Sequence, residues 1–181
     1  MLAFPCWRAA LPALALGAAV LAGAGGAAAA DPPWHVGASF GYAALFGDST
    51  WHGFGGGAQL AYELNDTFRL LADLDATEHP SPRWLVVSGA VGAAYVLDVL
   101  EWVPWAGAEI GPAALLSGAP TCGHAQPCAS LSLDLAVPFG LDYRISKRFN
   151  VGVGGRFQML LGSSQWTALS VGARAEYVWG K

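Results

Sequence analysis

Apolar residues alternate with small or polar residues in two adjacent stretches of the chain. From Leu131 to Tyr143 every second residue is apolar or aromatic, and the pattern restarts at Phe149 and runs to Met159. A period of two predicts a strand with two unlike faces, and the short break at 145–148 predicts a hairpin. Each strand would be roughly 10 to 14 residues long, well above the length common in soluble sheets. That length favours a transmembrane barrel, whose apolar face meets lipid while its lumen holds small and charged residues.

The same alternation predicts six more strands. They are Trp34–Phe46, Phe54–Leu64, Phe68–Ala76, Trp84–Leu97, Trp102–Leu116 and Trp166–Trp179. Residues 77–83 contain Pro80 and Pro82 and are expected to form a loop, and Pro104 and Pro112 interrupt the strand that begins at Trp102. Long and short connections alternate, as in outer-membrane barrels with short periplasmic turns and longer outer loops. We therefore expect an all-β fold, an eight-stranded antiparallel up-and-down transmembrane barrel.

The first 30 residues have the features of a secretory signal peptide. Arg8 supplies a positive charge, an Ala- and Leu-rich run follows, and Ala28–Ala30 fits cleavage before Asp31. An uncleaved membrane helix is the alternative. Apolar residues make up 54% of the chain, yet no second stretch of about 20 apolar residues could form a spanning helix. We expect a signal peptide at 1–30 and a barrel domain at 31–181, located in the outer membrane of a Gram-negative cell.

Charged residues fall on the face of the strands that is expected to line the lumen. This predicted interior charge network consists of Glu63, Arg69, Asp73, Asp75, Glu109, Asp134, Asp142, Arg144, Arg156, Arg174 and Glu176. A lone buried charge is costly, so these groups must pair or be hydrated. They would form either a structural salt-bridge plug or a narrow polar pore or proton path. Eight strands leave an interior just wide enough for side chains, which disfavours a general solute channel.

Aromatic residues gather at both ends of the predicted strands, as the two headgroup belts of a membrane barrel do. At the expected periplasmic ends lie Trp34, Tyr62, Phe68, Tyr95, Trp102, Tyr143, Phe149, Tyr177 and Trp179. Near the expected outer ends lie Tyr42, Phe46, Trp51, Phe54, Trp84, Phe157 and Trp166. We expect most of these side chains to face lipid.

With these features the chain resembles the small eight-stranded outer-membrane barrels, such as the OmpA transmembrane domain and the OmpX- and OmpW-like proteins. The resemblance covers about Trp34 to Trp179, and its best local piece runs from Pro138 through Arg144 to Gly152. It implies a fold and a membrane, and it names no activity. Such proteins usually end on an aromatic residue that the insertion machinery reads. Here Trp179 is followed by Gly180 and Lys181, so we expect that signal to be displaced or weakened.

Few residues suggest chemistry. Cys122 and Cys128 lie in an expected outer loop, and export favours a disulfide between them, with a metal site that includes His124 as the alternative. Some barrels resembling this one modify lipid A with a His, a Ser and a carboxylate at the lipid-facing rim. Here His35 is inward by parity, while His52, His79 and His124 are expected in loops and no His-x-Ser pair occurs.

The sequence thus predicts an integral outer-membrane barrel with a structural or surface-interaction role, in adhesion or defence, and without catalysis or a cofactor. A lipid-modifying enzyme, a narrow pore and a soluble barrel that holds an apolar ligand are the alternatives. Expected partners are membrane lipids, lipopolysaccharide, the barrel-assembly machinery and an extracellular ligand at the outer loops. The net charge of −4 and the lack of a basic patch give no indication of nucleic acid. We expect a monomer.

Overall fold

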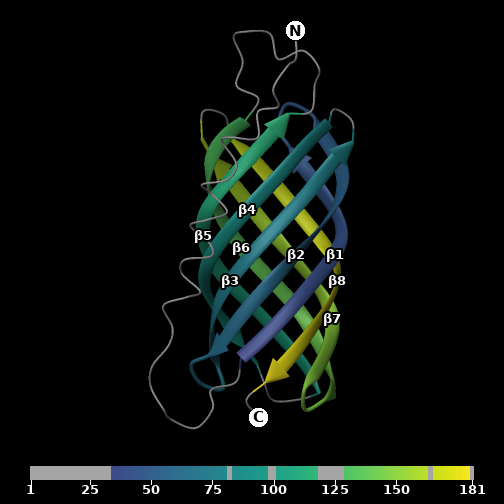
Figure 1. Ribbon diagram of the computed structural model, residues 1–181, viewed down its shortest axis with the longest axis vertical. Coiled ribbons are helices and arrows are strands. Elements are labelled where there is room, and N and C mark those ends of the chain that lie inside the picture. The colour runs from purple at the N-terminus through teal and green to yellow at the C-terminus, as the bar shows by residue number, and fades with distance from the viewer. Residues whose placement is uncertain (1–33, 81–82, 98–100, 118–128, 163–164, 180–181) are drawn as a thin grey trace, which may run out of the picture.

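The alternating stretches form eight long antiparallel strands that close into a barrel (Figure 1). A computed structural model describes residues 34–80, 83–97, 101–117, 129–162 and 165–179. Each strand pairs with its neighbours along the chain, and β8 closes the barrel on β1. The strands are β1 (Trp34–Phe46), β2 (Thr50–Glu63), β3 (Phe68–Pro80), β4 (Arg83–Val96), β5 (Trp102–Ser117), β6 (Ala129–Ser146), β7 (Phe149–Leu161) and β8 (Trp166–Trp179). The predicted fold class is therefore confirmed.

The two ends of the barrel differ. Trp34 begins β1 and pairs with Trp179, the last residue of β8. The start of β1 and the end of β8 therefore lie at the same end of the barrel, at the bottom of Figure 1. We call this the Trp34 end, and it also holds the β6–β7 turn. The opposite end, where β1 passes into β2, is the Trp51 end. Within the described residues no helix is long and apolar enough to cross a membrane.

Two predicted strand boundaries were wrong, because the alternation of apolar and polar residues is weak near proline and glycine. Residues 77–83 were expected to be a loop, but β3 continues to Pro80 and β4 begins at Arg83, with His79 paired to Trp84. Pro80 forms the last pair of the ladder, at a strand end where a missing N–H is tolerated. Likewise β2 begins at Thr50 instead of Phe54, because Trp51 pairs with Leu45.

The prolines do not interrupt β5. The ladder with β4 runs in a single register from Trp84–Ser117 to Val96–Trp105, and its pairs are missing only around Pro112. Because no bulge intervenes, Trp105 faces inward and is 9% exposed. The one register shift among the strand pairs that the structure describes lies between Arg144 and Ser146, at the end of β6.

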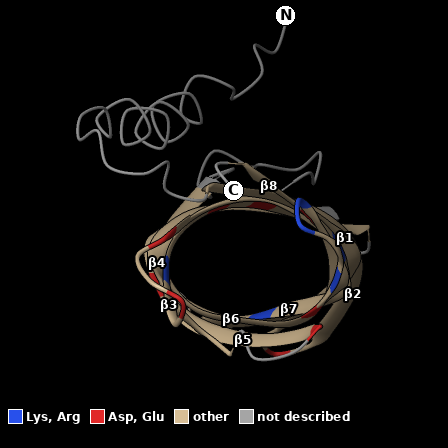
Figure 2. Cartoon of the chain, turned by 90° about the horizontal axis from the view of Figure 1, so that it is seen from below, with Lys and Arg blue, Asp and Glu red and all other residues tan. Residues whose placement is uncertain are grey.

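The outward face is apolar on every strand, and the inward face holds most of the polar groups. Phe40 is 66% exposed and Leu131 67% exposed, whereas Asp134 is fully buried. Viewed along the axis the strands form a closed ring, with charged positions on several of them (Figure 2). The candidate site therefore lies in the interior of the barrel, and the outer surface of the barrel is apolar.

Candidate functional site

A single arginine joins four carboxylates in the middle of the barrel. Arg156 of β7 donates from Nη1 to Asp73 at 3.2 Å and from Nη2 to Asp134 at 3.1 Å. It also pairs closely with Glu109, and its Nη1 lies 3.4 Å from Asp75. These residues come from β3, β5, β6 and β7, so the guanidinium cross-links four strands through its planar set of donors. We call this group the Arg156 cluster.

The Arg156 cluster is acidic and only partly satisfied. Four carboxylates surround one guanidinium, and one oxygen each of Asp73, Glu109 and Asp134 has no hydrogen-bond partner among the described residues. Gln158 assists by donating to Asp134 at 2.9 Å. Buried carboxylates of this kind depend strongly on their one positive partner.

A second network lies nearer the Trp34 end and surrounds His35. The Nδ1 atom of His35 lies 2.8 Å from Glu176, and its Nε2 atom lies 3.2 Å from Glu63. Arg69 donates to Glu63 at 3.0 Å, and Arg174 donates to Glu176 at 2.8 Å. We call these five residues the His35 network. The His35 network contains two carboxylates and three basic groups, so each carboxylate has a basic partner. Ion pairs of this kind link neighbouring strands.

Arg174 also packs against Trp105 and marks the border between the two networks. Its guanidinium lies 4.4 Å from the centre of the indole ring, a distance suited to a cation–π contact. Gly140 makes room for this arrangement, because a Cβ atom there would lie 2.7 Å from the indole. Arg174 further lies 3.3 Å from Asp142. The indole and the guanidinium thus fill the lumen at this level.

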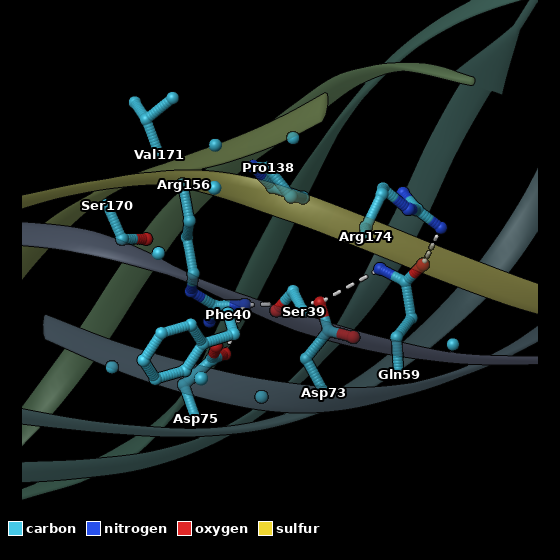
Figure 3. Close-up of a pocket in the computed structure, with 18 of the residues that line it drawn as sticks. Ser39, Phe40, Gln59, Asp73, Asp75, Pro138, Arg156, Ser170, Val171 and Arg174 are labelled. Carbon is cyan, nitrogen blue, oxygen red and sulfur yellow. Dashed lines mark hydrogen bonds and ion pairs between the residues drawn. The ribbon is translucent and has the colours of Figure 1, made fainter. Parts of the chain in front are cut away.

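A small cavity of about 80 Å³ lies beside the Arg156 cluster (Figure 3). Asp73, Asp75, Arg156 and Arg174 all line it, and Gln59 connects the two networks across it. Gln59 donates to Asp73 at 3.2 Å and accepts from Arg174 at 2.9 Å. A space of this size holds a few water molecules. It is too small to serve as a passage for solutes.

Glycines create this space. Five of them are adjacent across five strands, since Gly140 pairs with Gly154, Gly154 with Gly172, Gly172 with Gly41 and Gly41 with Gly55. Four of the five line the cavity. This glycine row leaves a strip of the inner wall without side chains, beside the cavity that Arg156 and Arg174 also line.

Three tryptophans close the lumen at the Trp51 end. Trp51, Trp84 and Trp166 pack against one another with ring centres 4.9 to 6.3 Å apart, and Trp51 stacks on Trp84. They pack on a buried apolar group made of Leu45, Val86, Ala113, Leu115, Leu160 and Ala168. The expectation that these three rings face lipid as part of an outer belt was wrong, because they lie on the inward parity. We call them the tryptophan plug.

Two histidines expected in loops lie in strands instead. His79 is in β3, is 1% exposed, and neither of its ring nitrogens has a hydrogen-bond partner within the described ranges. His52 is in β2 on the exposed outward face, where it hydrogen-bonds to Tyr42. His35, by contrast, faces inward as its parity indicated.

The aromatic residues at the Trp34 end form cross-strand pairs on the outside. The ring centres of Trp34 and Tyr62 lie 4.9 Å apart, and those of Phe68 and Tyr95 lie 5.5 Å apart. Trp179 stacks on Trp34 at 6.4 Å. Farther around this end, Tyr143 pairs with Trp102 at 4.9 Å, and Phe149 pairs in register with Tyr177. These residues follow the rim as a continuous band.

Some predicted site residues are placed differently or lie outside the structure. Arg144 was expected inside the barrel, but it is exposed, because β6 emerges at the Trp34 end just before the register shift. Cys122, Cys128 and His124 lie outside the described residues. Within the parts that the structure describes, no three His, Cys, Asp or Glu side chains are placed to hold a metal ion.

Sequence reasoning missed the tryptophan plug, the cavity and the glycine row. A signal for the plug was present, since Trp84 breaks the outward parity of its strand and Trp51 shares the parity of the lumen-facing glycines of β2. The glycine row depends on the register between strands, which the sequence alone does not contain.

Comparison with solved structures agrees with this architecture. Neisserial surface protein A is 19% identical, and the match covers 80% of this chain and 96% of that chain with a TM-score of 0.67. Ail, the attachment invasion locus protein of Yersinia pestis, is 14% identical, with 82% and 99% covered and a TM-score of 0.52. The outer membrane protein OprG from Pseudomonas aeruginosa is 11% identical, with 80% and 95% covered and a TM-score of 0.54. No protein-family model and no curated protein sequence matches the chain. The chain therefore has the fold of the small eight-stranded outer-membrane β-barrels, as the sequence resemblance predicted.

Proposed function

We propose that this chain is an integral outer-membrane protein with a structural or surface-interaction role, of the adhesion or defence type, and that it neither transports solutes nor catalyses a reaction. The observation that supports it best is the apolar outside. Every strand exposes a large apolar side chain, for example Phe40, Phe54, Leu70, Val91, Ile110, Leu135, Val153 and Val171 in the order of the strands. An apolar surface that continues around a whole molecule needs a bilayer.

The filled interior supports a role outside the lumen. The tryptophan plug, the Arg156 cluster and the layer of Trp105 and Arg174 follow one another along the axis. A narrow pore or proton path would have to pass all three. The expected alternation of long and short connections is reduced to one long connection, residues 118–128, between strands that meet at the Trp51 end. What the protein recognises then belongs to the Trp51 end, which faces outward from the cell when the turns at the Trp34 end are periplasmic.

Two proteins with this fold have names that refer to a surface or to attachment, Neisserial surface protein A and the attachment invasion locus protein. In line with them, we propose as partners the outer-membrane lipids, lipopolysaccharide, the barrel-assembly machinery during insertion, and an extracellular ligand at the outer loops. The proposal includes a monomer, removal of residues 1–30 as a signal peptide, and a disulfide between Cys122 and Cys128.

A lipid-modifying enzyme is the alternative that one observation favours. His52 and Tyr42 form a hydrogen-bonded pair on the outward face near the Trp51 end, where an outer-leaflet lipid would contact them. We expect the pair to satisfy its own polar groups and to do no chemistry. Mass analysis of lipid A from cells that express the wild type or His52→Ala checks this, and a change in lipid A mass only with the wild type would support the enzyme.

Membrane insertion is tested by electrophoresis and by partitioning into lipid vesicles. A closed barrel satisfies its backbone hydrogen bonds internally and keeps its shape in mild SDS, so heated and unheated samples should migrate differently. The chain should also remain with the vesicles after a carbonate wash. Identical migration together with solubility in the absence of detergent would show that the membrane proposal is wrong.

A further inference from the structure

The turn between β6 and β7 presents two cations from a fixed backbone. Lys147 and Arg148 are the two turn residues, and both side chains are exposed. The N–H of Arg148 donates to the Ser146 hydroxyl at 3.3 Å, and its carbonyl accepts from the N–H of Val178 at 2.9 Å. Because β8 and the end of β6 both hold the turn, its two charged side chains project from one place at the Trp34 end.

These two cations lack the partners that the interior cations have. Arg69, Arg156 and Arg174 each form ion pairs inside the barrel. No ion pair joins Lys147 or Arg148 to a carboxylate of the described chain. An adjacent ammonium and guanidinium with no internal anion suit an external group with several oxygens, such as a phosphate.

The surroundings of the turn favour a lipid as the source of that phosphate. Phe149, the next residue, is 40% exposed, and Ile145, just before the turn, is 57% exposed. The rings of Trp102 and Tyr143 pack against each other at this end, with their centres 4.9 Å apart. Aromatic rings of a membrane barrel lie at headgroup depth, so cations directly beyond the rings reach the level of the phosphates.

The basic character is local to this turn. Arg144, a third exposed cation, lies on the same hairpin, and the hydroxyl of Tyr143 beside it donates to Glu101 at 3.4 Å. The turn between β2 and β3 carries Asp66 and no cation. Among the turn residues that the structure describes at the Trp34 end, the cations therefore gather at the β6–β7 turn, which suits one bound headgroup and not a general attraction to the whole rim.

We infer that the β6–β7 turn binds the phosphate headgroup of an anionic phospholipid in the leaflet at the Trp34 end. The inference rests on the proposed membrane location. It adds a specific lipid site, with Lys147 and Arg148 as the binding residues and the adjacent aromatic rings as its apolar wall.

Native mass spectrometry of the folded full chain tests this site. The chain is released from micelles that contain equal amounts of phosphatidylglycerol and phosphatidylcholine, and the lipids retained by each variant are counted. The wild type should retain phosphatidylglycerol in preference to phosphatidylcholine. The double variant Lys147→Gln, Arg148→Gln should lower that preference about five-fold for each cation removed. The double variant Lys147→Arg, Arg148→Lys keeps both charges and should retain the preference.

Asp66→Asn is the matched control, because it raises the net charge at the other turn and should leave the preference unchanged. An equal preference in the wild type and in Lys147→Gln, Arg148→Gln would overturn the inference. Displacement of the lipid by an equal concentration of inorganic phosphate would also overturn it, since free phosphate would then suffice. Each variant is first checked for a heat-modifiable band. A chain that inserts into vesicles without preferring phosphatidylglycerol contradicts this inference alone, whereas a chain that does not insert contradicts the proposed function.

Discussion

At the scale of single residues, Arg156 has the largest share in holding the interior together. Its guanidinium contacts carboxylates from three other strands, and it is 5% exposed. Lysine has the same charge but lacks the planar fork of donors that can serve several carboxylates at once. The position therefore depends on the shape of the cation as well as on its charge.

Replacing Arg156 by Met should destabilise the folded barrel by about 3–5 kcal/mol, because the carboxylates of Asp73, Glu109 and Asp134 would lose their shared partner while remaining buried. The urea midpoint of unfolding in vesicles, followed by loss of the heat-modifiable band, measures the change. Arg156→Lys is the control and should lose less stability, since it keeps the charge. A Met variant as stable as the wild type would mean that the cluster contributes nothing to the fold.

At the scale of strands, the glycine row shows how closely neighbouring backbones approach. A Cβ atom on Gly41 of β1 would collide with the backbone of Val171 and Gly172 on β8, which cannot move aside as a flexible side chain can. On the same face of β1, a Cβ atom on Gly37 would meet its nearest atom at 3.5 Å, an ordinary contact. Gly41 therefore allows a close contact between β1 and β8 that Gly37 does not require, although both glycines have the same inward parity in the sequence.

Gly41→Ala should destabilise the barrel by about 1–3 kcal/mol through overpacking between β1 and β8. Gly37→Ala is its matched control and should be neutral or slightly stabilising, because alanine restricts the unfolded chain more than glycine does. Urea unfolding of both variants under identical conditions checks the difference. Equal stabilities would mean that the contact between β1 and β8 at Gly41 relaxes without loss.

The strands themselves could be predicted because a period of two depends only on local sequence. The alternation from Leu131 to Tyr143 fixed the inward and outward faces of β6 correctly, and the same reasoning placed Glu109 inward despite the prolines of β5. The ends of β3 and β4 were missed because Pro80 and Pro82 suggest a loop. What holds those ends is pairing between neighbouring strands, a contact that no single stretch contains.

At the scale of the whole molecule, the sequence predicted that charges lie inside but not which of them meet. Arg156 and Asp73 are 83 positions apart, and only closure of the barrel in a defined register brings them to 3.2 Å. The same closure brings Trp51, Trp84 and Trp166 from three strands into contact with one another. Aromatic residues near strand ends suggest a lipid belt. The alternation of inward and outward positions is least regular at strand ends, so it does not separate a belt of outward rings from a plug of inward rings.

The tryptophan plug should control access of water to the lumen from the Trp51 end. Ala113 lies beneath the plug and is 2% exposed. Ala113→Cys, made together with Cys122→Ser and Cys128→Ser, should therefore react slowly with a membrane-impermeant maleimide in the folded state. Adding Trp166→Ala removes a ring that packs at a tilt against both other tryptophans, with ring centres 4.9 and 6.3 Å apart, and leaves a cavity in the plug. Labelling should then become at least about ten-fold faster, because loss of the indole opens a path by which the reagent can reach the thiol.

Trp102→Ala is the matched control for this experiment, since Trp102 is 53% exposed on the outer surface at the opposite end. It should leave the labelling rate of the cysteine at position 113 unchanged. A heat-modifiable band in each variant shows that the barrel has folded before the rates are compared. If Trp166→Ala and Trp102→Ala gave the same slow rate, the three rings would be packing groups only, and the buried apolar group that includes Leu45, Leu115 and Leu160 would shield position 113 without them.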